Sequence, residues 1–445
     1  MKVITRFAPS PTGFLHVGGA RSALFNYLFA KQNGGQIILR IEDTDIERNK
    51  EEYITGITDA FKWLGIGFDL TYKQSDNFPI HRKYIEKLIS SGKAYISKEE
   101  IKKEGDRNEV IRFKNPNKDV TVDDIIKGQV KFNTTELGDF VIAKSLDEPI
   151  FHLSNVVDDI TSGITHVIRG EEHLSNTPRQ ILIWEAINEV SLPRYAHIPL
   201  ILSENREKIS KRKHGEIVSV EYYKEQGYLR DALLNFLVLL GWNPGNDEEI
   251  LSIDQMIEKF NIEKVQKAGA VFNREKLDWF NKQYMSKLSN EDFIDHCSKF
   301  VPKWLSNKPE LFGRALHIIR EKIHSFGDIA KIFEKGSEMN FIQDLGEYTA
   351  DSLLWKKNPN KEIASNHLKE IKKLLDTIAK DNFTSEVVKS AIWPYAEGNG
   401  KGDVLWPFRF ALTGQEKSPD PFSSAYILGK DESLVRIDLA ISKLM

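Results

Sequence analysis

The first 41 residues constrain the fold more than any other part of the chain. Residues 3–7 are a β-branched and aromatic run, residues 9–13 have turn chemistry, and residues 20–31 carry apolar side chains at helical spacing. Gly34 and Gly35 end that helix, and residues 36–41 predict a second strand. Strand, turn, helix and strand in this order predict a parallel βαβ unit. The chain therefore begins in an open α/β sheet.

Sheet character continues through the first half of the chain. Strands are expected at residues 151–157, 164–169 and 197–202. Thr177 and Pro178 predict the N-cap and first position of a helix. Between these elements, residues 98–124 are rich in charge and poor in large apolar side chains, which predicts a small, exposed insertion.

The second half is predicted to be mostly α-helical. From residue 222 onward strand signals fade, and apolar residues recur at helical spacing. Helices are expected at residues 229–240, 311–333, 363–378 and 434–444. At 445 residues the chain has room for about three domains.

Composition excludes several kinds of protein. No run approaches the roughly 20 apolar residues that span a bilayer, and the first residues do not resemble a signal peptide, so a cytoplasmic protein without a membrane partner is expected. The single cysteine, Cys297, excludes an internal disulfide and a multi-cysteine zinc site. The net charge of −3 combines 62 basic with 65 acidic residues, so any phosphate-binding surface must be a local patch.

Two segments have the chemistry of a phosphate site. Residues 6–21, RFAPSPTGFLHVGGAR, join the first strand to the first helix, where open α/β sheets bind ligands. Glycines let the backbone approach a nucleotide, the helix start favours phosphate, and His16 can donate hydrogen bonds to it. Residues 206–214 hold five basic side chains and one acidic side chain after a buried-looking strand. Either segment alone is also compatible with an ordinary turn or a solvated loop.

Together these segments resemble the bacterial glutamyl-tRNA synthetases of class I. His16-Val17-Gly18-Gly19 is similar to the family's HIGH signature, inside the wider form from Pro9 to Gly19, and Lys208-Ile209-Ser210-Lys211-Arg212 is similar to its KMSKS signature. Three more segments resemble this family, namely RIEDTD at residues 40–45, residues 156–180 and residues 409–422. The resemblance therefore extends over nearly the whole chain.

The resemblance implies a fold and a reaction. It implies a Rossmann-like α/β catalytic domain at residues 1–80 and 151–205, split by an acceptor-stem-binding insertion at 81–150. A stem-contact domain at 206–290 and a helical anticodon-binding domain at 291–445 would follow. The implied enzyme, expected to be a monomer, activates L-glutamate with ATP and Mg²⁺ and joins it to tRNA(Glu), and also or instead to tRNA(Gln).

By motif position the resemblance also implies site residues. Those expected at glutamate are Arg6, Ala8, Ser10, Glu42, Phe151, Asn155 and Arg169, and those expected at ATP are His16, Gly18, Gly19, Glu172, Ile201 and Lys211. Catalysis would come from positioning and charge stabilisation by His16, Lys208 and Lys211. Arg6 and Arg169 are the candidates to hold a carboxylate side chain, and Glu42 suits the substrate ammonium.

Two departures from the family pattern bear on this site. Phe151 stands where relatives commonly carry tyrosine, so one hydroxyl near the substrate is missing. The insertion has no cysteines, so zinc is expected to be absent. Asp158 and Asp159 do not indicate a metal site, because adjacent residues on the expected strand would point to opposite faces.

Other readings stay open at this point. An enzyme that glutamylates a modified base of tRNA, or a small-molecule nucleotidyltransferase, shares the catalytic signatures but leaves the helical C-terminal half unexplained. A non-catalytic tRNA-binding paralogue is disfavoured by retention of His16 and Lys211. A glutaminyl enzyme is disfavoured by the helical second half, and the choice between tRNA(Glu) and tRNA(Gln) is not decided by the sequence.

Overall fold

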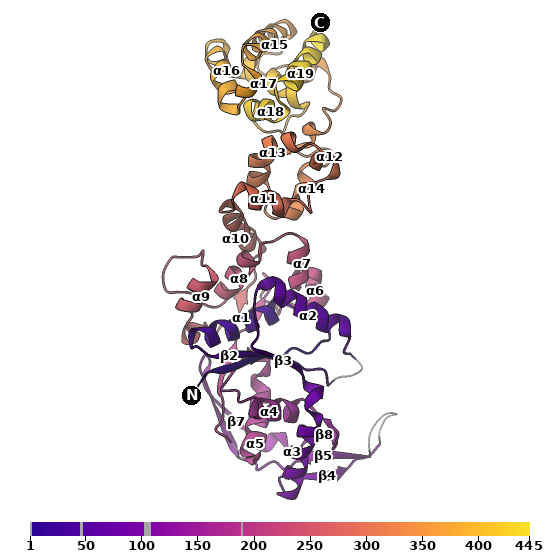
Figure 1. The fold of residues 1–445 in the computed structure, drawn as a ribbon, viewed down its shortest axis with the longest axis vertical. Helices are drawn as coiled ribbons and strands as arrows, with labels where there is room; N and C mark the ends of the chain where they lie inside the picture. The colour runs from indigo at the N-terminus through magenta and orange to yellow at the C-terminus, as the bar shows by residue number, and fades with distance from the viewer. Residues whose placement is uncertain (1, 45–47, 102–107, 188–189) are drawn as a thin grey trace. The chain divides into compact units, whose positions relative to one another are not determined.

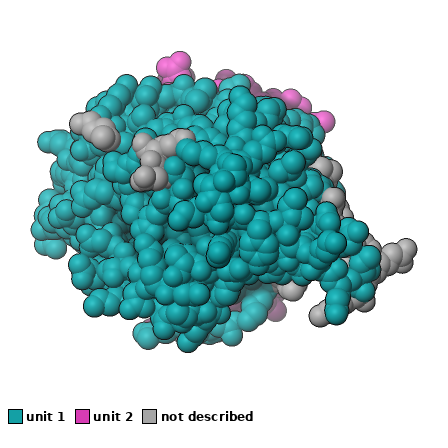
Figure 2. All heavy atoms as spheres, turned by 90° about the horizontal axis from the view of Figure 1, so that it is seen from below, with its two compact units in different colours: residues 1–284 teal, residues 285–445 magenta. Residues whose placement is uncertain are grey.

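A computed structural model describes residues 2–44, 48–101, 108–187 and 190–445, without the side chains of residues 211 and 212. The chain divides into two compact units, residues 1–284 and residues 285–445 (Figure 2). Each unit is considered by itself.

The first unit is built on a parallel sheet. Strands β1 (Ile4–Phe7), β2 (Gln36–Ile41) and β3 (Leu70–Lys73) pair in that order, and β10 (His166–Gly170) pairs with β11 (Arg194–Ile198). The backbone N–H of Thr165 donates to the oxygen of Ile4 at 2.9 Å, which sets β10 beside β1. The parallel strands thus run β3-β2-β1-β10-β11. Helix α1 (Val17–Gln32) connects β1 to β2, so the predicted βαβ unit is confirmed.

Helices cover both faces of this sheet (Figure 1). The apolar side chains of β2 alternate between them, because Leu39 and Ile41 join a core with α1 and α2 (Glu51–Leu64), whereas Ile38 joins a second core. That second core contains residues of α3 (Phe78–Ser90), α4 (Phe151–Thr161) and α5 (Thr177–Ile187). A strand buried on both faces is typical of a doubly wound parallel sheet.

The insertion between α3 and α4 contains two antiparallel groups of strands. One is the sheet β4 (Ala94–Lys98), β5 (Glu109–Phe113), β8 (Phe140–Ser145) and β9 (Glu148–Pro149). The other is the hairpin of β6 (Asp119–Asp124) and β7 (Gly128–Asn133), whose Asp124 pairs with Tyr195 of β11. Residues 102–107 of the segment expected to be exposed, 98–124, lie outside the described residues. In the rest the expectation is wrong in part, because Ile111, Val122 and Asp124 are 3%, 0% and 3% exposed.

Three local expectations are also wrong. Residues 151–157 form the start of helix α4 instead of a strand, because helical spacing turns Asn155, together with the following Asp159, toward a buried charge network. Thr177 has helical dihedral angles, φ −58° and ψ −41°, so it is the first residue of α5 and not its N-cap. Pro199 interrupts the strand expected at 197–202, leaving β11 and the short β12 (Ile201–Leu202).

The rest of the first unit is mainly helical. Strand β12 pairs with β13 (Ala270–Val271). The helices are α6 (Lys211–His214), α7 (Val220–Glu225), α8 (Arg230–Leu239), α9 (Ile253–Lys259) and α10 (Arg274–Ser286), the last of which crosses the boundary between the units.

The second unit is helical throughout its described elements. They are α11 (Asn290–Cys297), α12 (Lys303–Ser306), α13 (Pro309–Lys322), α14 (Ile329–Ile332), α15 (Lys361–Asp376), α16 (Ser385–Asn399), α17 (Lys401–Thr413), α18 (Pro421–Leu428) and α19 (Lys430–Leu444). The helices expected at 229–240, 363–378 and 434–444 are confirmed within a few residues, whereas that expected at 311–333 is broken after Lys322. None of the described helices is long and apolar enough to cross a membrane.

Candidate active site

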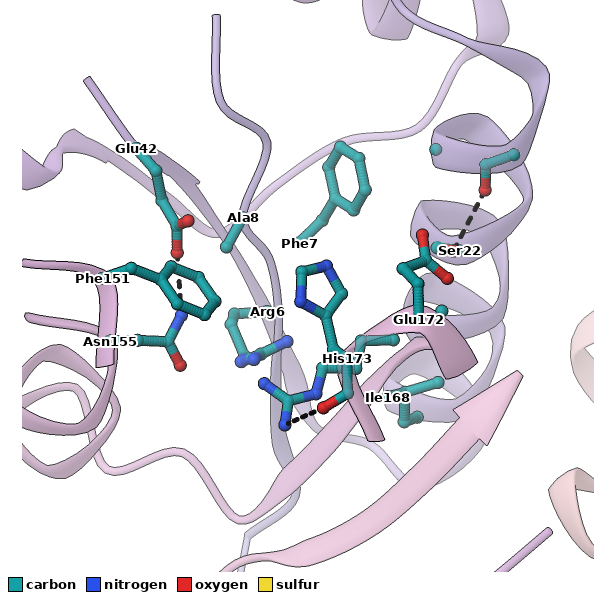
Figure 3. A pocket seen from close by; sticks show the side chains of 14 residues that line it. Arg6, Phe7, Ala8, Ser22, Glu42, Phe151, Asn155, Ile168, Glu172 and His173 are labelled. Carbon is teal, nitrogen blue, oxygen red and sulfur yellow. Dashed lines mark hydrogen bonds between the residues drawn. The ribbon is translucent and has the colours of Figure 1, made fainter. Parts of the chain in front are cut away.

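A pocket opens at the carboxyl ends of β1 and β10, the adjacent strands from which the chain winds in opposite directions (Figure 3). This is the switch point where open α/β sheets bind ligands. The first pocket is lined by Arg6, Phe7, Ala8, Gly18, Gly19, Ser22, Glu42, Phe151, Asn155, Ile168, Arg169, Gly170, Glu172 and His173. Six of the seven residues expected at the amino acid therefore lie together, and the seventh, Ser10, lines an adjoining hollow.

Strand alternation places three arginines on one face of the sheet. Arg6 stands opposite Ile38 in the register of β1 and β2, and Arg40 is two residues beyond Ile38. Arg169 lies two residues beyond Val167, which packs in the same core as Ile38. Helix α4 covers this face, and its carboxylates meet the arginines there.

Asp159 of α4 is the anion shared by two of these arginines. Its Oδ1 accepts a hydrogen bond from Arg40 Nη1 at 2.6 Å and one from Arg6 Nε at 3.3 Å. Burial opposes ionisation of Asp159, but the attraction of Arg6 and Arg40 outweighs it and holds the pKa below its usual value. For Arg40, burial is likewise outweighed by its carboxylate neighbours, so its pKa lies well above the ordinary range. This network holds the Arg6 side chain at the pocket floor.

Glu42 provides the negative charge of the first pocket. Its Oε1 accepts from Asn155 Nδ2 at 2.8 Å (Figure 3). The same oxygen accepts from Arg40 Nη2 at 3.2 Å. Gln180 in turn donates to the Asn155 oxygen at 3.3 Å, which fixes the orientation of that amide. Burial raises the pKa of Glu42, and Arg40 and Arg6 oppose the increase. Oε2 of Glu42 has no hydrogen-bond partner in the described part of the chain, so it is available to a cationic group of a ligand.

Arg169 differs from the other two arginines because no carboxylate among the described residues pairs with it. Its Nε donates to His197 Nε2 at 3.2 Å, and its Nη2 donates to Thr177 Oγ1 at 2.8 Å and to the His173 oxygen at 3.4 Å. Burial, followed by the nearby charge of Arg6, lowers its pKa to about 10, so the guanidinium still carries its charge at neutral pH. With Arg169 only 7% exposed and its Nη1 unpartnered in the described chain, an anionic ligand group is needed to complete the site.

An aromatic wall closes one side of the first pocket. The ring of Phe151 lies 5.8 Å from that of His173, centroid to centroid, at a tilt of 33°. Burial, with the charge of Arg169 in second place, lowers the pKa of His173 to about 4, so the ring is neutral at pH 7. Ala8 lines the pocket without a polar side chain, and Ser10 is exposed at the rim.

A second pocket adjoins the first. Gly18, Gly19, Ser22, Gly170 and Glu172 line both, and the second also includes His16, Arg21, Pro199, Leu200, Ile201, Lys208, Ile209 and Ser210. The Gly-rich segment, residues 6–21, and the basic segment, residues 206–214, therefore meet at this pocket. The side chains of Lys211 and Arg212 lie outside the described residues, so the roles expected of them stay predictions.

His16 caps the start of α1 beside this second pocket. Its Nδ1 accepts a hydrogen bond from the backbone N–H of Gly18 at 3.0 Å. Burial, followed by the charge of Lys208, lowers the pKa of His16 to about 4. A neutral ring that accepts at Nδ1 carries its proton on Nε2, so His16 can donate one hydrogen bond to a ligand oxygen.

The glycines at this helix start leave little room for a side chain. A Cβ on Gly19 would lie 3.2 Å from Leu15 Cδ1 and 3.3 Å from Phe7 Cζ, whereas one on Gly13 would meet nothing within 4 Å. The close packing at Gly19 lets the first turn of α1 present its backbone to both pockets, where the helix start favours phosphate.

Several site residues were not predicted from the sequence. Phe7, Ser22, Ile168, Gly170 and His173 line the first pocket. Arg40 lies within the quoted segment RIEDTD without an assigned role, although its spacing from Glu42 places both on one strand face. His197 and Asp124 had no local signal, because their significance depends on contacts between distant segments.

Comparison with protein families finds matches to two domain models. The model of the class I tRNA synthetases (E and Q), catalytic domain, matches residues 2–105 and 96–279. The model of an anticodon binding domain matches residues 291–441. The two matches together account for most of the chain.

Individual relatives match along the whole chain. The glutamate–tRNA ligase 2 of Caldicellulosiruptor saccharolyticus is 38% identical, with 100% of this chain and 99% of the relative covered. The glutamate–tRNA ligase of Aquifex aeolicus is also 38% identical at the same coverage. A crystal structure of a glutamate tRNA ligase from Elizabethkingia meningosepticum in complex with its amino acid superposes with a TM-score of 0.87, at 32% identity and full coverage of both chains.

Proposed function

We propose that this chain, which belongs to the bacterial-type glutamyl-tRNA synthetases of class I, activates L-glutamate with ATP and transfers it to the 3′ end of tRNA(Glu). The observation that carries the proposal is the buried Arg169 guanidinium, which lacks a carboxylate partner in the described chain and faces a pocket next to a phosphate-binding helix start. The reaction class comes from the family, and the residue roles below are proposals.

The first pocket is proposed to hold glutamate. The side-chain carboxylate of the substrate would lie between Arg169 and Arg6, both of which keep N–H groups without partners among the described residues. The substrate ammonium would face Oε2 of Glu42, whose other oxygen is held by Arg40 and Asn155. A neutral amide side chain would leave a buried guanidinium without its anion, so the site should favour glutamate over glutamine. Phe151 would contribute an apolar wall in place of a hydroxyl.

The second pocket is proposed to hold ATP. Nε2 of neutral His16 and the first-turn N–H of Gly19 would contact the phosphates beside the backbone of Gly18, whose own N–H is donated to His16. Lys208 would add positive charge as pyrophosphate leaves. Glu172 and Ile201 line the same pocket and would contact the nucleoside. Lys211 is proposed to complete the charge stabilisation.

Because the two pockets share a wall, bound glutamate and ATP would meet beside Gly18 and Gly19. The α-carboxylate of glutamate would attack the α-phosphate, forming glutamyl-adenylate and releasing pyrophosphate. The terminal ribose hydroxyl of tRNA would then take the acyl group and release AMP. No protein nucleophile is required, and positioning supplies much of the rate enhancement.

Mg²⁺ is proposed to accompany ATP. The described residues contain no group of three or more His, Cys, Asp and Glu side chains that could hold a metal. The ion would therefore be coordinated mainly by phosphates and water. Glu172 is the carboxylate that lines this pocket. When bound, it would neutralise charge on the phosphates. We also propose that the enzyme works without zinc, as a cytoplasmic monomer.

Aminoacylation tests the proposal. The purified chain is mixed with ATP, magnesium and labelled glutamate, and transcripts of the glutamate, glutamine and aspartate tRNAs are offered separately. We expect charging of tRNA(Glu), and charging of tRNA(Gln) in addition would identify a non-discriminating enzyme. The Lys211→Ala variant is the inactive control, because the proposed role predicts slow glutamyl-adenylate formation with the fold retained.

The same assay separates the alternatives. If no transcript is charged, including native modified tRNA, the proposal is wrong, and a nucleotidyltransferase or a tRNA-binding paralogue becomes the better account. If Lys211→Ala exchanges pyrophosphate at the wild-type rate, Lys211 has no part in the reaction.

A further inference from the structure

Arg169 is held from behind by a buried histidine–aspartate pair that the proposed reaction does not use. Nε of Arg169 donates to Nε2 of His197 at 3.2 Å, and Nδ1 of His197 lies 2.6 Å from Oδ2 of Asp124. The three side chains are 7%, 0% and 3% exposed in that order. Arg169 and His197 are also direct partners in the register of β10 and β11, so their side chains leave the same face of the sheet.

Asp124 is itself fixed by backbone groups. Its Oδ1 accepts from the N–H of Ile126 at 3.0 Å and of Lys127 at 2.8 Å, and its Oδ2 also accepts from the N–H of His197 at 3.0 Å. Asp124 ends strand β6 of the insertion, where it pairs with Gly128 of β7 and with Tyr195 of β11. A carboxylate with this many donors cannot rotate freely, so its free lone pair has a defined direction toward Nδ1 of His197.

This geometry determines the tautomer of His197. Since the Asp124 carboxylate accepts the Nδ1 proton, Nε2 of a neutral ring presents a lone pair, which is what the Nε–H of Arg169 requires. Burial lowers the pKa of His197, although its bond to Asp124 opposes the decrease, so the ring is neutral near pH 7. The opposite tautomer would direct an N–H at the guanidinium.

We infer that Asp124 and His197 are positioning residues for Arg169, and that they hold its guanidinium so that the unpartnered Nη1 faces the substrate carboxylate. With Nε held by His197 and Nη2 held by Thr177 Oγ1 and the His173 oxygen, Nη1 is the part of the fork left to a ligand. A residue of the insertion thereby acts on the amino-acid pocket. This inference rests on the proposed function, in which Arg169 binds the side chain of glutamate.

The test compares three substitutions of His197 in the full chain. His197→Phe keeps an aromatic ring, although a larger one, and removes both nitrogens. His197→Gln can place an amide oxygen where Nε2 was and accept from Arg169, whereas His197→Asn can place an amide N–H where Nδ1 was and donate to Asp124. Gln thus restores the contact with Arg169, and Asn restores the contact with Asp124.

The KM for glutamate and the KM for ATP are measured for each variant by tRNA aminoacylation. Loss of one hydrogen bond to a charged group predicts an increase of about tenfold or more in the glutamate KM for His197→Phe, with the ATP KM nearly unchanged. We expect Gln to recover glutamate affinity better than Asn. His367→Phe is the control, because His367 is a buried histidine of the second unit that forms a hydrogen bond with Tyr395 at 2.9 Å and lines neither pocket, so both KM values should stay at the wild-type level.

Other results would overturn the inference. Equal increases in both KM values, or recovery by Asn as good as recovery by Gln, would mean that His197 only holds the insertion to the sheet. An unchanged glutamate KM in His197→Phe would also exclude the positioning role. Failure of the wild-type chain to charge tRNA would instead refute the proposed function, and Arg169→Ala tests the pocket assignment separately.

Discussion

Replacing Arg169 by alanine should weaken the use of glutamate far more than the binding of ATP. The guanidinium is 7% exposed, keeps its charge at neutral pH and has no carboxylate partner in the described chain. Truncating one partner of a buried, hydrogen-bonded charge pair costs about 2–5 kcal/mol. Arg6 remains beside the substrate carboxylate, so we expect the lower part of that range, which corresponds to a roughly 30- to 300-fold loss in kcat/KM for glutamate.

The assay is pyrophosphate exchange and aminoacylation over a matrix of glutamate and ATP concentrations. Arg169→Lys should recover little activity, because an ammonium keeps the charge but cannot bond His197, Thr177 and the substrate in the same fixed fork. Arg82→Ala is the control, since Arg82 is a half-exposed arginine of the same unit that pairs with surface carboxylates. A fall in ATP affinity with glutamate use intact would refute the pocket assignment.

Two further predictions concern the glycine turn and the half-buried His166. Gly19→Ala should slow adenylate formation, because the added Cβ would lie 3.2 Å from Leu15 Cδ1. Gly13→Ala in the same motif should be close to wild type in pyrophosphate exchange, because its Cβ would meet nothing within 4 Å. Equal exchange rates in the two variants would contradict the close-packing argument. Burial, aided by Arg194, lowers the pKa of His166 to about 4 from 6.5, so the unfolded chain binds this proton more readily and stability falls as pH decreases from 6.5 toward 4. The thermal unfolding midpoint should therefore fall less between pH 7 and pH 5 in His166→Phe than in the wild type. His317→Gln, at an exposed position, should fall as much as the wild type. Equal pH dependence of the midpoint in all three proteins would contradict this argument.

The elements predicted correctly are those whose ends depend on neighbouring residues in the sequence. Strand β2 begins and ends at the predicted residues. Gly35 precedes it, and its apolar side chains are buried alternately on the two faces of the sheet. Helix α1 ends at Gln32, shortly before Gly34 with φ 58°, a conformation that glycine adopts at little cost. The phosphate-binding turn was also predictable, since its glycines, prolines and histidine are contiguous.

The helix α4 was not predictable in the same way. Its β-branched residues favour a strand, and nothing in the local sequence compensates for burying Asp158 and Asp159. For Asp159 the compensation comes from Arg40 and Arg6, which are more than a hundred residues away in the chain. For Asp158 it comes from hydrogen bonds with Gln74, Asn77 and His81, which are also distant in the chain. A helix brings Asn155 and Asp159 onto one side, at a spacing of four residues, so that both reach this network. Long-range pairing of charges therefore overrides the local strand preference.

The same limit applies to His197 and Asp124, which are separated by 73 residues. Seen alone, Asp124 belongs to a charged segment, and such segments are usually solvated. Its burial follows only once the hairpin of β6 and β7 lies against β11. Side-chain pairs that position a catalytic residue are hard to find from one sequence, because neither partner touches the ligand.

The apolar core and the polar site depend on one another through strand register. Ile38 packs in the core with α4 and α5, and this fixes Arg40, two residues later, on the face where α4 supplies Asp159. A slip of one residue in β2 would turn Arg40 and Glu42 toward α1, where the side chains are apolar. The burial of a cation and an anion away from their partners would then oppose the slip, in addition to the loss of apolar packing. The charged pocket thus helps to specify the sheet on which it is built.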